Sequence, residues 1–137
     1  MTVKRFFDTN VLLYGYDLDA PEKRRVALDL IEQGWGNLDR TAISVQVLQE
    51  FFVNFVRAGH DPAEAAALVG DFSHWPVIEN SLALFRLGVS LQARWRISLW
   101  DAMILAAAHT SGARELLTED LNHGQDYGGV VVVNPFL

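Results

Sequence analysis

Four acidic residues lie where apolar segments of this chain end or bend: Asp8 after VKRFF, Glu50 in SVQVLQEFF, Asp101 in SLWDAMILAAA and Asp120 in ELLTEDLNHG. A fold that brings such ends to one edge of a sheet would place the four carboxylates together. Carboxylates at short range repel one another, so a cluster of this kind normally implies a bound cation. The residues therefore predict a metal site built from oxygen ligands.

Each of these acidic residues also has an ordinary structural interpretation. Asp8 could cap a helix or form an Asx turn, because Asp favours both roles. Glu50 could belong to an exposed polar stripe, since polar residues precede and follow it by one helical turn. Asp101 follows Ser98 by three residues, the spacing of a capping box, and such a cap is compatible with metal binding. Asp120 could lie in a simple turn.

Other polar residues near these positions are weaker candidates. Glu119 competes with Asp120 as a ligand, and Thr118 could donate a hydrogen bond to a carboxylate or a metal-bound water. None of the four histidines has the HxxxH spacing of a zinc site, and His123 is expected to be an exposed loop residue. The segment 94–96, Arg-Trp-Arg, is the best candidate for phosphate contacts, although a solvated helix end is the favoured interpretation.

The composition limits the class of protein. The chain has 137 residues, of which 50% are hydrophobic and 20% are charged, so we expect one globular domain over residues 1–137. No apolar run is long enough to span a bilayer, and the absence of cysteine fits a cytoplasmic location. The net charge of −6 argues against a simple nucleic-acid-binding module. It does not exclude a nuclease, because bound divalent ions reverse the local potential.

The hydrophobic pattern predicts strands that alternate with helices. Strands are expected at VKRFFD, TAIS, ARELLT and GGVVVVN, the last buried on both faces, with extended chain around residues 75–78. Helices are expected over residues 10–14, 21–34 and 99–110, after Ser44 and Asp61, and from residue 80 or 81 to 95, with Gly88 weakening the middle of that last helix. This order predicts an α/β fold with a mostly parallel central sheet flanked by helices.

The chain resembles a PIN domain, and within that superfamily the VapC-type toxin ribonucleases. The resemblance spans nearly the whole chain and rests on four motifs in order: FFDTNVLLY, SVQVLQEFF, SLWDAMILAAA and LLTEDLNHGQDYGGVVVVNPF. The acidic site of the family matches Asp8 in DTN, Glu50 in QVLQEF, Asp101 in WDA and Asp120 in TED. The hydroxyl or amide auxiliaries of the family match Asn10, Ser44 and Thr118 more loosely.

The resemblance implies a function and partners. It implies cleavage of RNA that depends on Mg²⁺ or Mn²⁺, a cognate VapB-like antitoxin that blocks the site, and a homodimer. The residue types agree with that chemistry, because oxygen ligands without cysteine or paired histidine select Mg²⁺ or Mn²⁺ over zinc. In this hypothesis Asp8 and Asp101 are the principal metal ligands, and Glu50 and Asp120 bind a second ion or orient the attacking water. The products would carry 5′-phosphate and 3′-hydroxyl ends.

Three other classes of protein share part of this acidic pattern. Phosphotransferases of the haloacid-dehalogenase kind need a second Asp two residues after the first, where this chain has Asn10. A phosphorylated receiver domain needs a lysine near its last strand, and no lysine follows Lys23. A non-catalytic protein-interaction module with a PIN fold is the alternative that the sequence leaves open.

Overall fold

A parallel sheet forms the centre of the computed structural model, which describes residues 3–137. Its strands within that range are β1 (Arg5–Phe7), β2 (Thr41–Ser44), β3 (Val77–Ile78), β4 (Glu115–Leu117) and β5 (Val131–Val133). They lie in the order β3-β2-β1-β4-β5, and every neighbouring pair is parallel. The predicted α/β class with a parallel sheet is therefore confirmed.

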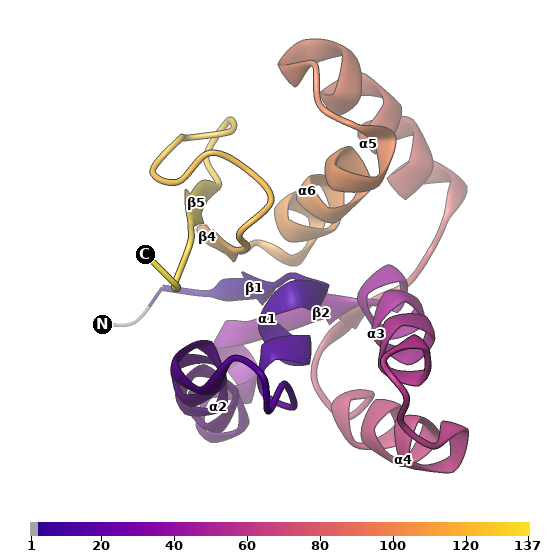
Figure 1. The fold of residues 1–137 in the computed structure, drawn as a ribbon. Coiled ribbons are helices and arrows are strands. Elements are labelled where there is room, and N and C mark those ends of the chain that lie inside the picture. The colour runs from indigo at the N-terminus through magenta and orange to yellow at the C-terminus, as the bar shows by residue number, and fades with distance from the viewer. Residues whose placement is uncertain (1–2) are drawn as a thin grey trace.

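Helices cover both faces of this sheet. They are α1 (Thr9–Tyr14), α2 (Pro21–Gly36), α3 (Val45–Arg57), α4 (Pro62–Phe72), α5 (Leu82–Trp95) and α6 (Leu99–Ser111), with a short 3₁₀ helix, η1 (Leu38–Arg40), before β2. Figure 1 shows α5 and α6 on one side of the sheet, and α2, α3 and α4 on the other. Because neighbouring strands are parallel, their carboxyl ends all lie at the same edge of the sheet.

Side-chain caps fix where several helices begin. The predicted caps Ser44, Asp61 and Ser98 each accept a hydrogen bond from a backbone N–H in the first turn of α3, α4 and α6, respectively. Such a bond satisfies one of the N–H groups that a helix start leaves unpaired. The caps at Ser44 and Ser98 matter for the site, because the helices that they start carry Glu50 and Asp101.

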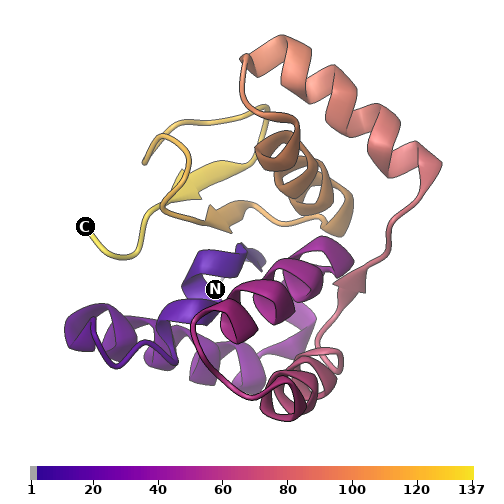
Figure 2. The same ribbon diagram turned by 45° about the vertical axis from the view of Figure 1, so that its right-hand side comes forward.

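Helix α6 is the most buried helix of the molecule. Six of its residues from Ala102 to Ala108 are buried, and α5 lies across it (Figure 2). Gly88 allows this close packing, because a Cβ atom at that position would overlap the Met103 sulfur atom. The glycine that weakened the prediction for α5 is thus explained by packing rather than by a break in the helix. In residues 3–137 no helix is both long and apolar enough to cross a membrane.

The last strand differs from the expectation. β5 is an edge strand that pairs only with β4 within the described sheet. Val132 is fully buried, whereas Val131 and Val133 remain partly exposed. The prediction that this strand is buried on both faces is wrong for two of its three residues, because a run of valines does not distinguish a central strand from an edge strand.

Candidate active site

Asp8 lies at the centre of a group of polar residues at the carboxyl edge of the sheet. It follows the central strand β1 and caps α1, since its Oδ1 accepts the Thr9 N–H at 2.7 Å. Its Oδ2 accepts the Thr118 hydroxyl at 2.7 Å. The Asp8 N–H donates to the Leu117 carbonyl at 3.0 Å, which continues the pairing of β1 with β4. Asp8 is only 4% exposed, so neighbouring atoms surround its side chain and fix its position.

Burial makes the charged form of Asp8 unfavourable. Desolvation raises the pKa of Asp8 from 3.8 to about 7, the hydrogen bonds from Thr118 and Thr9 oppose that rise, and the charges of Asp120 and Glu50 add to it. A carboxylate in this setting is stabilised by a nearby cation, because a cation compensates for lost hydration and for like charge together. Perturbed acids of this kind are typical of functional sites.

Glu50 reaches the same edge from the middle of α3. Its Oε1 accepts the Thr9 hydroxyl at 2.7 Å, and its Oε2 accepts the Gln46 side-chain amide at 3.2 Å. The same amide donates to the Trp100 carbonyl at 3.2 Å, which connects α3 to the start of α6. Glu50 therefore does not belong to a solvated stripe. Glu50 is half-buried, and its hydrogen bond with Thr9, the residue that follows Asp8, holds it near Asp8.

Asp101 and Asp120 complete the group from the other side. Asp101 lies in the first turn of α6, where the Ser98 hydroxyl accepts its N–H at 3.1 Å. Desolvation is the main cause that raises the pKa of both carboxyls. The charges of Asp120 and Glu50 raise the pKa of Asp101 further, and the charges of Glu119 and Glu50 raise that of Asp120 further. The charge of Glu50 thus acts on each of the other three acids named from the sequence.

Asn10 contacts one of these acids, Asp120, directly. Its Nδ2 donates to Asp120 Oδ2 at 2.9 Å and to the Thr118 hydroxyl oxygen at 3.3 Å. Its Oδ1 is buried and has no hydrogen-bond partner. An oxygen left in that condition is costly unless a donor or a cation reaches it.

Glu119 has partners of its own, although its charge also raises the pKa of Asp120. Its Oε1 accepts the Tyr14 hydroxyl at 2.8 Å, and its Oε2 forms an ion pair with Lys23 Nζ at 3.4 Å. The Lys23 ammonium also lies over the Tyr14 ring, 4.6 Å from its centroid. Because both oxygens already have partners, Glu119 is the weaker candidate of the pair that the sequence left open.

His123 and the basic segment also have structural roles. His123 is exposed, and its Nδ1 accepts the Asn134 N–H at 3.0 Å, which ties the loop after Asp120 to the chain after β5. The Arg94 guanidinium lies over the Trp95 ring, 4.6 Å from its centroid. Arg96 ends α5 in the left-handed conformation, with φ 54°. The 94–96 segment is thus the end of a helix, the interpretation that the sequence favoured.

Sequence reasoning missed Thr9, Tyr14 and Lys23. The Thr9 hydroxyl joins Glu50 to the Asp8 region. Thr9 and Tyr14 lie within the motif FFDTNVLLY, so the sequence held a signal for these two residues, whereas Lys23 lies in α2 outside the four motifs. The hydrogen bonds of Tyr14 with Glu119 and of Thr9 with Glu50 were not predictable, because they join positions that only the fold brings together.

The donor set suits a hard divalent cation. Every side chain that approaches the centre of the group offers oxygen, the chain has no cysteine, and Asn10 Oδ1 lacks a partner. Oxygen ligands of this kind are those of Mg²⁺ and Mn²⁺. Among residues 3–137, however, no three His, Cys, Asp or Glu side chains already converge on one point as metal ligands do. Thr9, Asn10 and Thr118 instead donate hydrogen bonds to the carboxylates of Glu50, Asp120 and Asp8, respectively.

Comparison with known proteins places the fold and the family. The PIN domain profile matches residues 5–125, which is most of the chain. The chain belongs to the PIN-domain family. A curated relative, Ribonuclease VapC24 of Mycobacterium tuberculosis, is 30% identical to this PIN domain over 139 residues, covering 93% of this chain and 94% of the relative.

Solved structures resemble this PIN domain over nearly its full length. A chain of a toxin–antitoxin complex from Klebsiella pneumoniae aligns with a TM-score of 0.67 and 26% identity, covering 96% of this chain and 98% of that one. A chain of the DNA-bound VapBC of Salmonella typhimurium aligns with the same TM-score at 20% identity, covering 96% and 97%. The second likeness supports the fold alone, because its identity is low. The resemblance to VapC-type proteins inferred from four motifs is confirmed.

Proposed function

We propose that this PIN domain is a metal-dependent endoribonuclease and the toxin of a toxin–antitoxin pair. The observation that carries the proposal is the buried Asp8 carboxyl, whose pKa is raised to about 7, together with the carboxylates of Glu50, Asp101 and Asp120 that act on one another around it. A core of acids that destabilise one another is costly unless it serves binding or chemistry. The relative named as a ribonuclease supports RNA as the substrate class.

The four acids of the proposed site have two roles. Asp8 and Asp101 would hold Mg²⁺ or Mn²⁺, and Glu50 and Asp120 would hold a second ion or orient a water for in-line attack on the phosphodiester. When bound, the cation would neutralise charge that develops on the phosphate and would acidify the attacking water. Within the chain, Thr118 and Thr9 orient Asp8 and Glu50, and Asn10 orients Asp120.

The partners follow from the same family. The 26% identical structure is a toxin–antitoxin complex, which supports a cognate VapB-like antitoxin as the protein partner. An antitoxin with basic residues would suit the acidic surface of this chain, whose net charge is −6. We further expect a homodimer and a cytoplasmic location.

The test is cleavage of total cellular RNA by the purified protein free of antitoxin. Reactions contain Mg²⁺, Mn²⁺ or EDTA, and the Asp8→Asn variant is tested beside the wild type. Discrete fragments that require metal, carry 5′-phosphate ends and are absent with Asp8→Asn are the expected result. Fragments with 2′,3′-cyclic phosphate ends would contradict attack by a metal-activated water. Neither cleavage nor metal binding under any condition would favour the non-catalytic interaction module.

A further inference from the structure

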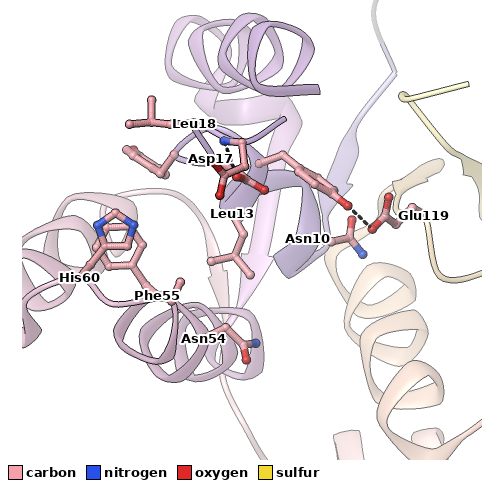
Figure 3. Close-up of a pocket in the computed structure, with 12 residues that line it drawn as sticks. Asn10, Leu13, Asp17, Leu18, Asn54, Phe55, His60 and Glu119 are labelled. Carbon is pink, nitrogen blue, oxygen red and sulfur yellow. Dashed lines mark hydrogen bonds between the residues drawn. The ribbon is translucent and has the colours of Figure 1, made fainter. Parts of the chain in front are cut away.

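A pocket of about 690 Å³ opens beside the acidic group and has no part in the chemistry proposed above. It lies between α1, the chain that follows α1, the end of α3 and His60. Figure 3 shows Asn10 and Glu119 at one end of the pocket and Phe55 and His60 at the other. Asn10 also donates to Asp120, so the near end of the pocket is one side chain away from the proposed reaction centre. Its volume is in the range that accommodates small ligands.

Aromatic rings form much of the pocket wall. Tyr14, Tyr16, Phe55 and His60 all line it. The His60 ring stacks on Phe55 with ring centroids 3.9 Å apart and an interplanar angle of 6°. Phe55 covers one face of the imidazole, and the His60 side chain still keeps 36% of its surface exposed, so the ring can accept a second stacking partner. A flat ring with a free face is a stacking platform for another flat ring.

The polar part of the lining accepts hydrogen bonds and carries negative charge. Apart from the Tyr14 and Tyr16 hydroxyls and the His60 ring, it consists of Asn10, Asn54 and the carboxylates of Asp17, Asp19 and Glu119, of which Glu119 is already paired with Lys23. No lysine or arginine is among the described lining residues. Such a lining repels a phosphate and attracts a neutral ligand that has N–H donors. Asp17 is already oriented, because its Oδ1 accepts the Asp19 N–H at 3.0 Å.

We propose that this pocket binds one unpaired nucleobase of the RNA substrate in the strand that flanks the cut site, and that guanine is the preferred base. This inference rests on the proposed function. The base stacks on His60 and turns its donor edge to Asp17, while the ribose-phosphate chain stays outside the acidic lining and runs to the carboxylate group. Guanine fits best because its ring N–H and 2-amino group lie side by side and pair with one carboxylate through two parallel hydrogen bonds.

The test measures binding in EDTA, where no metal-dependent cleavage occurs. GMP, IMP and UMP are titrated into the ¹⁵N-labelled wild-type protein, and amide NMR shifts are followed. IMP differs from GMP only by the missing 2-amino group, so the comparison isolates the proposed contact. We expect shifts confined to the pocket and about tenfold tighter binding of GMP than of IMP or UMP, the size of discrimination that a bidentate contact gives.

Variants separate the two contacts. Asp17→Asn keeps the acceptor for the Asp19 N–H and should reduce the preference of GMP over IMP to within about threefold. His60→Ala should weaken the binding of all three nucleotides about tenfold, and His60→Phe should restore it, because stacking does not depend on the base. Glu32→Gln, which removes one exposed carboxylate from α2, should leave all three affinities unchanged.

Several outcomes overturn the inference. They are equal affinities for GMP and IMP, shifts outside the pocket, or no saturation at millimolar nucleotide, and the wild-type titrations alone reveal each of them. Shifts in the pocket with a basic antitoxin peptide but not with nucleotides would identify a protein groove instead. If RNA is cut but the variants change neither nucleotide binding nor cut sites, the pocket inference fails and the proposed function stands. If GMP binds as expected but no RNA is cut with any metal, the proposed function fails and the pocket is a guanine site without a role in cleavage, which overturns the inference as stated.

Discussion

The Thr118 hydroxyl donates to Asp8 Oδ2 at 2.7 Å, although the two residues are 110 positions apart in the chain. The same hydroxyl oxygen accepts the Asp120 N–H at 3.0 Å and the Asn10 amide at 3.3 Å. One buried side chain therefore connects the end of β1, the start of α1 and the segment after β4. Thr118 is the group through which the two ends of the chain share a single polar network.

Replacing Thr118 by Val removes this network while keeping the side-chain shape. Asp8 Oδ2 and the Asp120 N–H would lose their partner, so we expect Thr118→Val to lower the free energy of unfolding by about 1–3 kcal/mol. Thr118→Ser is the matched control, because it keeps the hydroxyl and loses only a methyl group. Urea unfolding at pH 7 in EDTA measures both. Equal losses in the two variants would show that the hydroxyl contributes little.

The raised pKa of Asp8 predicts how stability depends on pH. Between 3.8 and about 7 the folded state holds a proton on Asp8 that the unfolded state releases, so the free energy of unfolding falls as pH rises through this window. The full effect is on the order of 4 kcal/mol, complete above the folded pKa. Asp101 and Asp120 contribute in the same direction, because their pKa values are also raised.

Asp8→Asn should remove most of this dependence. The variant loses one of the two hydrogen bonds that Asp8 accepts, so it should be less stable than the wild type near pH 4.5 and equal or more stable near pH 8. Urea midpoints across pH 4.5–8 in EDTA give the two profiles. A wild-type stability that rises over this range would show that Asp8 is ionised in the folded protein at low pH.

Asp101→Asn tests the carboxylate group without disturbing the core. Removing one of the repelling charges should stabilise the metal-free protein at pH 8 by less than about 1 kcal/mol, since Asp101 is only half-buried. The wild type should gain about 2.7 kcal/mol from Mg²⁺ at a hundredfold excess over its dissociation constant, and the variant should lose that gain. Thermal unfolding with and without Mg²⁺ measures both, with Glu32→Gln as the charge-matched control. A metal shift that survives Asp101→Asn would remove Asp101 from the ligand set.

Asp120 and Glu119 can be separated by activity. Glu119 is held by Tyr14 and Lys23, so Glu119→Gln should change kcat/KM for RNA cleavage by no more than about threefold. Asp120→Asn should lower it at least about a hundredfold, the usual cost of removing a charge that acts on the transition state. Single-turnover cleavage of one defined substrate compares the two variants. The opposite order would place Glu119 in the site.

The sequence predicted the fold well where a single residue, such as a helix cap, determines where a helix begins. Ser44, Asp61 and Ser98 began helices as expected, and the strand before Asp8 was placed within a few residues. The role of β5 as an edge strand was not predictable, because its sequence alone does not show how many neighbours it has. Likewise, the four acids were named, but the contacts of Thr9 with Glu50 and of Asn10 with Asp120 depend on tertiary structure. Glu119 and Asp120 are adjacent, and the sequence does not show which of the two side chains points toward the other acids, so it could not decide which one belongs to the site.

The order of strands has a consequence for the chain during synthesis. Asp8 lies after the central strand, and β4, which is made late, is the neighbour that brings Thr118 and Asp120 to it. A polypeptide still on the ribosome can therefore form β1, β2, α3 and even α6 while Asp8 lacks one of its two hydrogen-bond donors. Only the emergence of the final segment closes the group of acids, so an unfinished chain carries most of the sequence motifs without the assembled site.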